Sequence, residues 1–123
     1  VYGVVDAPWP MLDRDTIVRF DYRQDPLTRE IVITITNAPD FIPARENLVR
    51  VPDFGGFWKL RPQAGGRVEV IYQVYGDPGG LVPVWLANFA AQRSVIRTLQ
   101  NLGPAVARYA GAHSPFVQEL AAD

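Results

Sequence analysis

The chain has 123 residues, a formal net charge of -1 and 48% hydrophobic residues, which is ordinary for one globular domain with one core. This balanced charge gives no basis for a nucleic-acid partner, and we expect none. The absence of cysteine excludes disulfides, thiolate metal sites and cysteine nucleophiles. No run is apolar enough to span a bilayer, so we expect a soluble protein, either cytoplasmic or exported.

Alternating apolar and polar residues predict a series of strands in the first part of the chain. The predicted strands lie at 2–5, 16–23, 30–36, 48–51, 57–62 and 67–75. A short turn with Leu27 at its tip joins the second strand to the third, so these two are expected to form a hairpin. The segment from Pro52 to Gly56 predicts an interruption between the fourth strand and the fifth.

One long helix is predicted after the strands, from about Pro83 to Leu102. Pro83 suits the first turn of a helix, where its missing N–H would be unpaired anyway. Gly103-Pro104 is expected to end or kink the helix. Strands first and one helix last predict an α+β fold, in which a curved antiparallel β-sheet (meander) is packed by one long C-terminal α-helix.

Four stretches of the chain, taken in order, carry a family likeness. They are the proline-rich loop followed by Asp13-Arg14-Asp15, the stretches 48–51 and 57–62, and the long stretch 70–88 with its Asp77-Pro78-Gly79-Gly80 turn. This ordered set resembles the C-terminal part of a START (StAR-related lipid transfer) domain, of the helix-grip or Bet v1-like superfamily. The likeness assigns 1–110 to such a domain and leaves 111–123 as a tail.

The resemblance implies that a single lipid or sterol occupies a cavity between the sheet and the C-terminal helix, without catalysis, cofactor or metal. Hydrophobicity selects the strand residues that would line the cavity: Val18, Phe20, Tyr22, Ile33, Ile35, Trp58, Leu60, Val70 and Tyr72. The family's lid and gate would match Leu27, Val82, Trp85, Leu86 and Phe89. For each strand residue the alternative is an ordinary core position, which is the commoner role.

Two arginines, Arg14 and Arg50, are candidate contacts for a lipid head group. For Arg14 we favour the alternative of a loop salt bridge with Asp15, worth about 0–1 kcal/mol. Trp9, between two prolines, is expected to be a packed loop anchor, with transient membrane-surface contact as the alternative. His113 is the only histidine, and the sequence offers it no partners for a metal site or a Ser/His arrangement.

A START domain also has an N-terminal helix, further strands and two short helices before the point that matches Val1. We therefore expect the N-terminal part of the fold to be missing, with an exposed sheet edge that favours a homodimer or a strand-exchanged assembly. Two other functions stay open. A helix-grip enzyme of the polyketide cyclase or aromatase type needs acid–base groups in the cavity, where this chain offers mainly Tyr22 and Tyr72. A ligand-sensing regulatory module needs a partner protein.

Overall fold

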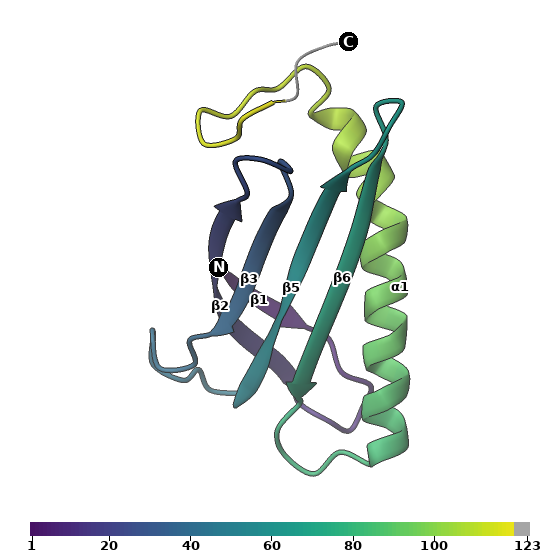
Figure 1. Ribbon diagram of the computed structural model, residues 1–123. Helices are drawn as coiled ribbons and strands as arrows, with labels where there is room; N and C mark the ends of the chain where they lie inside the picture. The colour runs from purple at the N-terminus through teal and green to yellow at the C-terminus, as the bar shows by residue number, and fades with distance from the viewer. Residues whose placement is uncertain (120–123) are drawn as a thin grey trace.

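The computed structural model describes residues 1–119 and consists of a curved sheet with one long helix beside it (Figure 1). The elements in chain order are β1 (Tyr2–Val5), β2 (Asp13–Gln24), β3 (Ile31–Asn37), β4 (Leu48–Arg50), β5 (Asp53–Pro62), β6 (Val68–Asp77) and α1 (Val84–Arg108). The predicted α+β fold, a curved antiparallel sheet with one long C-terminal helix, is confirmed. No helix within residues 1–119 combines the length and the apolar character that crossing a membrane requires.

The strands form one six-stranded sheet in the order β1-β2-β3-β5-β6, with β4 paired to β2 outside this path. β2 is shared between two parts of the sheet, because residues 14–17 pair with β1 and residues 18–24 pair with β3. Residues 13–15 also pair with β4, and this pairing is parallel. The sheet is therefore an antiparallel meander to which β4 adds one parallel pairing.

The predicted interruption between the fourth and fifth strands is correct only in part. Pro52 separates β4 from β5, but the residues after it already belong to β5 and pair with β6. A β-carbon on Gly56 would lie 2.0 Å from the carbonyl oxygen of Gln73, and the φ angle of Gly56 is +152°. Glycine here permits a close approach of two backbones inside the sheet, so the Gly-Gly pair does not mark a turn.

α1 continues through Pro104 to Arg108, so the predicted end or kink at Gly103-Pro104 does not stop it. None of the residues of α1 is buried. Proline removes one backbone hydrogen bond from a helix, and on an exposed helix water can bond the freed carbonyl group. Exposure thus explains how the helix tolerates Pro104.

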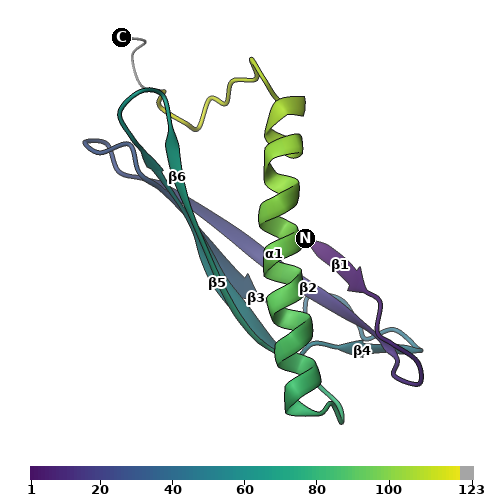
Figure 2. The same cartoon turned by 90° about the vertical axis from the view of Figure 1, so that its right-hand side faces the viewer.

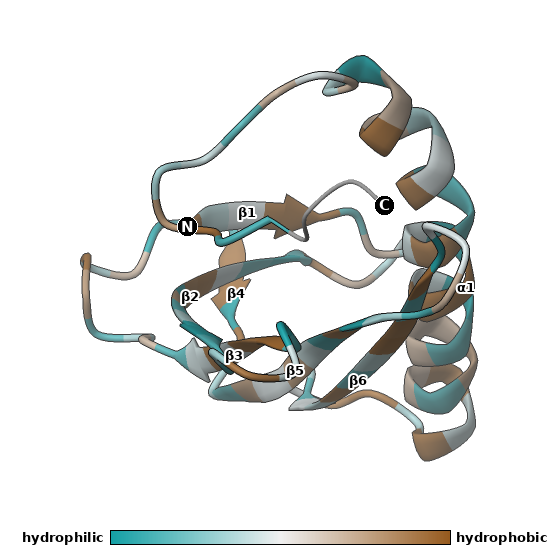
Figure 3. Ribbon diagram, turned by 45° about the horizontal axis from the view of Figure 1, so that its top comes forward, coloured by the Kyte–Doolittle hydropathy of each residue, from teal (hydrophilic) through white to brown (hydrophobic). Residues whose placement is uncertain are grey.

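The helix crosses the sheet obliquely (Figure 2). Its N-terminal end lies near the β6–α1 connection, and its C-terminal end stands away from β5 and β6. The following residues, 109–119, arch from the end of α1 back over the sheet (Figure 3). There Gln118 forms hydrogen bonds with Gln24, the last residue of β2.

The closely packed core is small and lies around the first half of β2. Its buried apolar residues are Ile17, Val18, Ile35 and Val51. Asp15, beside them on β2, is only 1% exposed. The packing is therefore tightest around β2 and its neighbours, and α1 contributes no buried residue to it.

Candidate functional site

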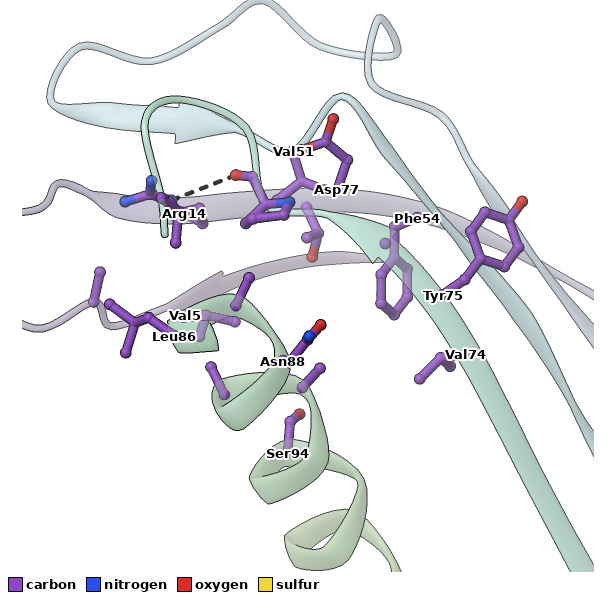
Figure 4. Close-up of a pocket in the computed structure, with 18 of the residues that line it drawn as sticks. Val5, Arg14, Val51, Phe54, Val74, Tyr75, Asp77, Leu86, Asn88 and Ser94 are labelled. Atoms are coloured by element: carbon purple, nitrogen blue, oxygen red, sulfur yellow. Dashed lines mark hydrogen bonds between the residues drawn. The ribbon is translucent and has the colours of Figure 1, made fainter. Parts of the chain in front are cut away.

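An apolar cleft lies between α1 and the sheet, at the end nearest the β6–α1 connection (Figure 4). Its volume is about 310 Å³, at the lower end of the range for small-molecule sites. The sheet side of the cleft includes Phe54, Tyr72 and Val74, and the opposite side includes Leu86 of α1 and Val82 of the β6–α1 connection. Both walls are therefore aliphatic or aromatic over most of their area.

Polar side chains are few in the cleft and lie at separate points of its lining. Asn88 and Ser94 project from α1, and Asp77 and Arg14 lie on the opposite side (Figure 4). The carboxylate of Asp77 accepts a hydrogen bond from the backbone N–H of Gly79 at 2.9 Å, which tightens the turn after β6. These groups can orient a ligand, but they do not form a nucleophile and base in contact with each other.

Arg14 fixes the β6–α1 connection to β2. Its side chain is 9% exposed, and its guanidinium group donates hydrogen bonds to the carbonyl oxygens of Leu12, Pro78 and Gly79. Gly79 and Gly80 have φ angles of +72° and +70°, in the left-handed region that glycine enters without steric cost. The connection can thus fold back onto Arg14, which sets the point from which α1 starts.

The expected ion pair between Arg14 and Asp15 is wrong. Asp15 instead accepts two hydrogen bonds from Arg50, from Nε and from Nη2, both at 2.9 Å. Adjacent residues of a strand point to opposite faces of the sheet, so Arg14 and Asp15 meet different partners. The hydrogen bonds from Arg50 hold the pKa of Asp15 below its ordinary value of 3.8, although burial acts in the other direction.

Arg50 also joins the loop that precedes β4 to the sheet. Its Nη1 donates to the carbonyl oxygen of Ile42 at 2.9 Å, and its Nη2 donates to that of Pro43 at 3.1 Å. Arg50 does not line the cleft, whereas Arg14 does. Of the two head-group candidates, the structure therefore brings only Arg14 to this site.

The nine strand residues selected by hydrophobicity lie on one face of the sheet. The register places Trp58 opposite both Ile33 and Tyr72. It also places Tyr22 opposite Ile33, so one row crosses the sheet from β2 to β6. Only Tyr72 lines the cleft itself, and the same face continues beyond it through Val18, Phe20, Tyr22, Ile33, Ile35, Trp58, Leu60 and Val70. Contact of this face with a ligand stays a prediction.

An aromatic pair forms the boundary between the cleft and the rest of this face. The rings of Trp58 and Tyr72 stack with their centroids 4.1 Å apart and an interplanar angle of 20°. Burial raises the pKa of the Tyr72 hydroxyl. The hydroxyl therefore stays protonated at neutral pH and is a poor general base.

The five predicted lid and gate residues are placed differently from one another. Val82 and Leu86 line the cleft. Trp85 and Phe89 are 71% and 56% exposed, and Leu27 at the tip of the β2–β3 turn is 90% exposed. The contribution of these three residues to a lid stays a prediction. Trp9 is 93% exposed, so the expectation of a packed loop anchor is wrong.

Sequence reasoning missed the small residues that α1 turns toward the cleft. They are Ala87, Ala90, Ala91 and Ser94. Their spacing puts them on one face of a helix, together with Leu86. This spacing is visible in the sequence, but the larger apolar side chains of Trp85 and Phe89 favour the neighbouring face of the helix.

Comparison with known proteins gives a consistent set of relatives, although no protein-family model matches the chain. The chain is 35% identical over 101 residues to an uncharacterized protein of Pseudomonas aeruginosa, covering 82% of this chain and 50% of that protein. It is 29% identical over 114 residues to the phosphatidylcholine transfer protein of Mus musculus, covering 88% of this chain and 52% of that protein. The chain thus spans about half the length of the curated relatives it matches.

A solved structure shows the same likeness in three dimensions. It is a fragment of a STAR-related lipid transfer protein from Xanthomonas axonopodis, which superimposes with a TM-score of 0.64 at 39% sequence identity. The match covers 73% of this chain and 50% of that one. Sequence and fold therefore point to the same group of proteins.

Proposed function

We propose, from the premise that this chain belongs to the START (StAR-related lipid transfer) family, that its cleft binds one apolar ligand of the lipid class. The observation that carries the proposal is the apolar cleft between α1 and the sheet, which opens onto a continuous row of aromatic and aliphatic side chains. Relatives named for the transfer of phosphatidylcholine and of lipid support it. The protein would hold or carry such a ligand and release it unchanged.

Burial of hydrocarbon supplies enough free energy for this role. Each buried methylene group contributes roughly 0.8 kcal/mol. A tail of about ten methylene groups would contribute about 8 kcal/mol before the cost of association. The cleft of about 310 Å³ suits one acyl chain or a small ring system, with further apolar surface along the sheet.

Enzymatic activity is the second candidate, and the chemistry of the cleft disfavours it. A cyclase or aromatase would need a group that takes up a proton near neutral pH. Tyr72 is held as the neutral phenol by burial, and Tyr22 lies on the exposed outer part of the row. The double variant Tyr22→Phe/Tyr72→Phe discriminates the two functions, since lipid binding should survive and turnover should collapse.

A bulky side chain in the cleft tests the proposal directly. Ala87 lines the cleft from α1, so Ala87→Trp should fill it and reduce the affinity for a fluorescent fatty acid, cis-parinaric acid, by at least about tenfold. Ala107→Trp is the matched control, because Ala107 is an exposed residue of α1 outside the cleft lining. Equal binding by both variants would refute the cleft as the ligand site.

Native mass spectrometry with lipid extraction identifies the natural ligand class. We expect an apolar molecule to be released from the purified protein and to be missing from the Ala87→Trp variant. A ligand without an acyl chain, sterol or comparable apolar part would contradict the proposed class.

Membrane contact and self-association are two further proposals. The apolar side chains of Trp9 and Leu27 are almost fully exposed, which suits brief contact with a membrane surface. β1 and β6 end the strand order, so each offers an edge to a second chain. Vesicle co-sedimentation of Trp9→Ser and Leu27→Ser variants tests the first, and light scattering of the unaltered protein tests the second.

A further inference from the structure

We propose that residues 109–119, here called the tail, form a strap that ties the C-terminal end of α1 to the β2–β3 hairpin and slows the exit of a bound ligand. The inference rests on the proposed lipid-binding function and adds a controlling element to it. The tail leaves α1 where the helix stands away from β5 and β6, and it crosses toward the hairpin (Figures 1 and 2). Its contact point lies 94 positions away in sequence.

A reciprocal pair of hydrogen bonds forms the latch. The side-chain Nε2 of Gln24 donates to the backbone carbonyl oxygen of Gln118 at 3.0 Å, and the backbone N–H of Gln118 donates to Oε1 of Gln24 at 2.8 Å. The guanidinium group of Arg29 also donates to the side-chain oxygen of Gln118. The side-chain amide of Gln24 thus bonds both the backbone N–H and the backbone carbonyl group of Gln118, much as a residue of a neighbouring strand would.

On the hairpin side of the latch, hydrogen bonds within the β2–β3 turn hold the shape of the turn. The carboxylate of Asp25 accepts hydrogen bonds from the backbone N–H groups of Leu27 and Thr28 at 2.8 and 2.7 Å. Arg29 has a φ angle of +62°, in the left-handed region that residues with a side chain enter at a cost. The turn therefore holds a strained residue in place at the point where that residue reaches Gln118.

The tail side of the latch is folded onto itself. The backbone N–H of Ala112 donates to the carbonyl oxygen of Tyr109 at 2.9 Å, and that of Val117 donates to the carbonyl oxygen of Ser114 at 3.2 Å. His113 and Glu119 also contact each other through their side chains. These contacts turn the tail into a short defined connection instead of a loose chain end.

This tie matters because packing does not hold the far half of α1. No residue of the helix is buried, and Ile96, Leu99 and Val106 are exposed. Gln24 closes the inward-facing series of β2 that begins with Val18, so the latch stands at the edge of the face proposed to hold the ligand. Release of Gln118 would free the helix end to move away from that face.

The exit rate of cis-parinaric acid tests the strap, with vesicles of phosphatidylcholine as the acceptor in a stopped-flow experiment. Gln24→Ala removes both reciprocal bonds and should raise the exit rate about five- to thirtyfold. Gln118→Ala keeps the backbone bonds and loses only the Arg29 contact, so we expect about two- to tenfold. Gln73→Ala, an exposed glutamine of β6, is the matched control and should leave the rate unchanged.

A second measurement needs no ligand. In hydrogen exchange, Gln24→Ala should speed the exchange of the last amides of α1, residues 101–103 and 105–108, and leave those of the first turns unchanged. An unchanged exit rate together with unchanged exchange would overturn the strap while leaving the binding function intact. Failure of the unaltered protein to bind the fatty acid would overturn the proposed function itself, and the strap with it.

Discussion

The two ends of α1 are held by different kinds of interaction. At its start, the buried guanidinium group of Arg14 bonds three carbonyl oxygens, and two glycines in the left-handed region let the connection before the helix turn back onto it. At its far end, the hydrogen bonds that tie the helix to the sheet within residues 1–119 are the exposed ones of Gln118. A buried charged group is costly to unpair, whereas exposed hydrogen bonds exchange readily with water. We therefore expect the start to act as a fixed pivot and the far end to be the part that moves.

The buried ion pair beneath the pivot should give the largest effect on stability. Asp15→Asn removes the charge that Arg50 faces, and we expect a loss of about 3 kcal/mol in the free energy of unfolding, measured with urea. Asp21→Asn, on the same strand in an exposed pair with Arg19, is the matched control and should change little. Equal losses of unfolding free energy in the two variants would show that the first half of β2 is held no more firmly than the exposed outer part.

Loss of the hydrogen bonds of Arg14 should have the second-largest effect on stability. Arg14→Met keeps most of the buried stem and deletes the donors to three carbonyl oxygens, so we expect a loss of about 1–3 kcal/mol. Hydrogen exchange should quicken in the first turn of α1 rather than in the last. Arg93→Met, an exposed residue of the same helix, serves as the control. Faster exchange at the far end instead would contradict the pivot.

Acid should loosen the pivot region in a defined direction. The pKa of Asp15 is lower in the folded chain than its ordinary value of 3.8, chiefly through the hydrogen bonds of Arg50. Its stabilising contribution is therefore fully present above that value and is lost as the pH falls through the lower folded pKa. Carboxyl NMR titration checks this. A pKa for Asp15 at or above 3.8 in the folded chain would refute the assignment.

The smallest effect is expected on the exposed outer part of β2. Arg19→Ala breaks an ion pair between two exposed side chains, and we expect a change of about 0–1 kcal/mol that shrinks in high salt. Urea unfolding at low and high salt measures it. A loss as large as that of Asp15→Asn would show that the second half of β2 is as firmly held as the first.

The strands could be predicted from the sequence because their signal is local. Apolar and polar residues alternate within 16–23 and within 30–36, so each strand can be recognised from its own residues. The register then places Tyr22 opposite Ile33, as a hairpin between these two strands requires. The curved sheet and the long terminal helix follow from the order of such segments. The inward face could be named for the same reason, since one alternate set was clearly more apolar.

The features that the sequence did not predict depend on distant partners. Asp15 meets Arg50 only because β4 returns to pair with β2, which no local pattern around Asp15 reveals. The strand character of Gly55 and Gly56 likewise depends on the approach of β6. The sequence favours large apolar residues such as Trp85 at the cleft, yet the small residues of α1 line it and Trp85 is exposed, because the orientation of the helix against the sheet depends on the tertiary fold.

The shared role of β2 also bears on how the chain folds. Its second half meets β3 and its first half meets β1 through short connections, whereas the pairing of residues 13–15 with β4 must wait for residues 48–50 to return. Contacts between nearby residues form sooner than those that close long loops. We therefore expect the meander from the second half of β2 to β6 to assemble early, with the β4 pairing and the Asp15–Arg50 contact completed late.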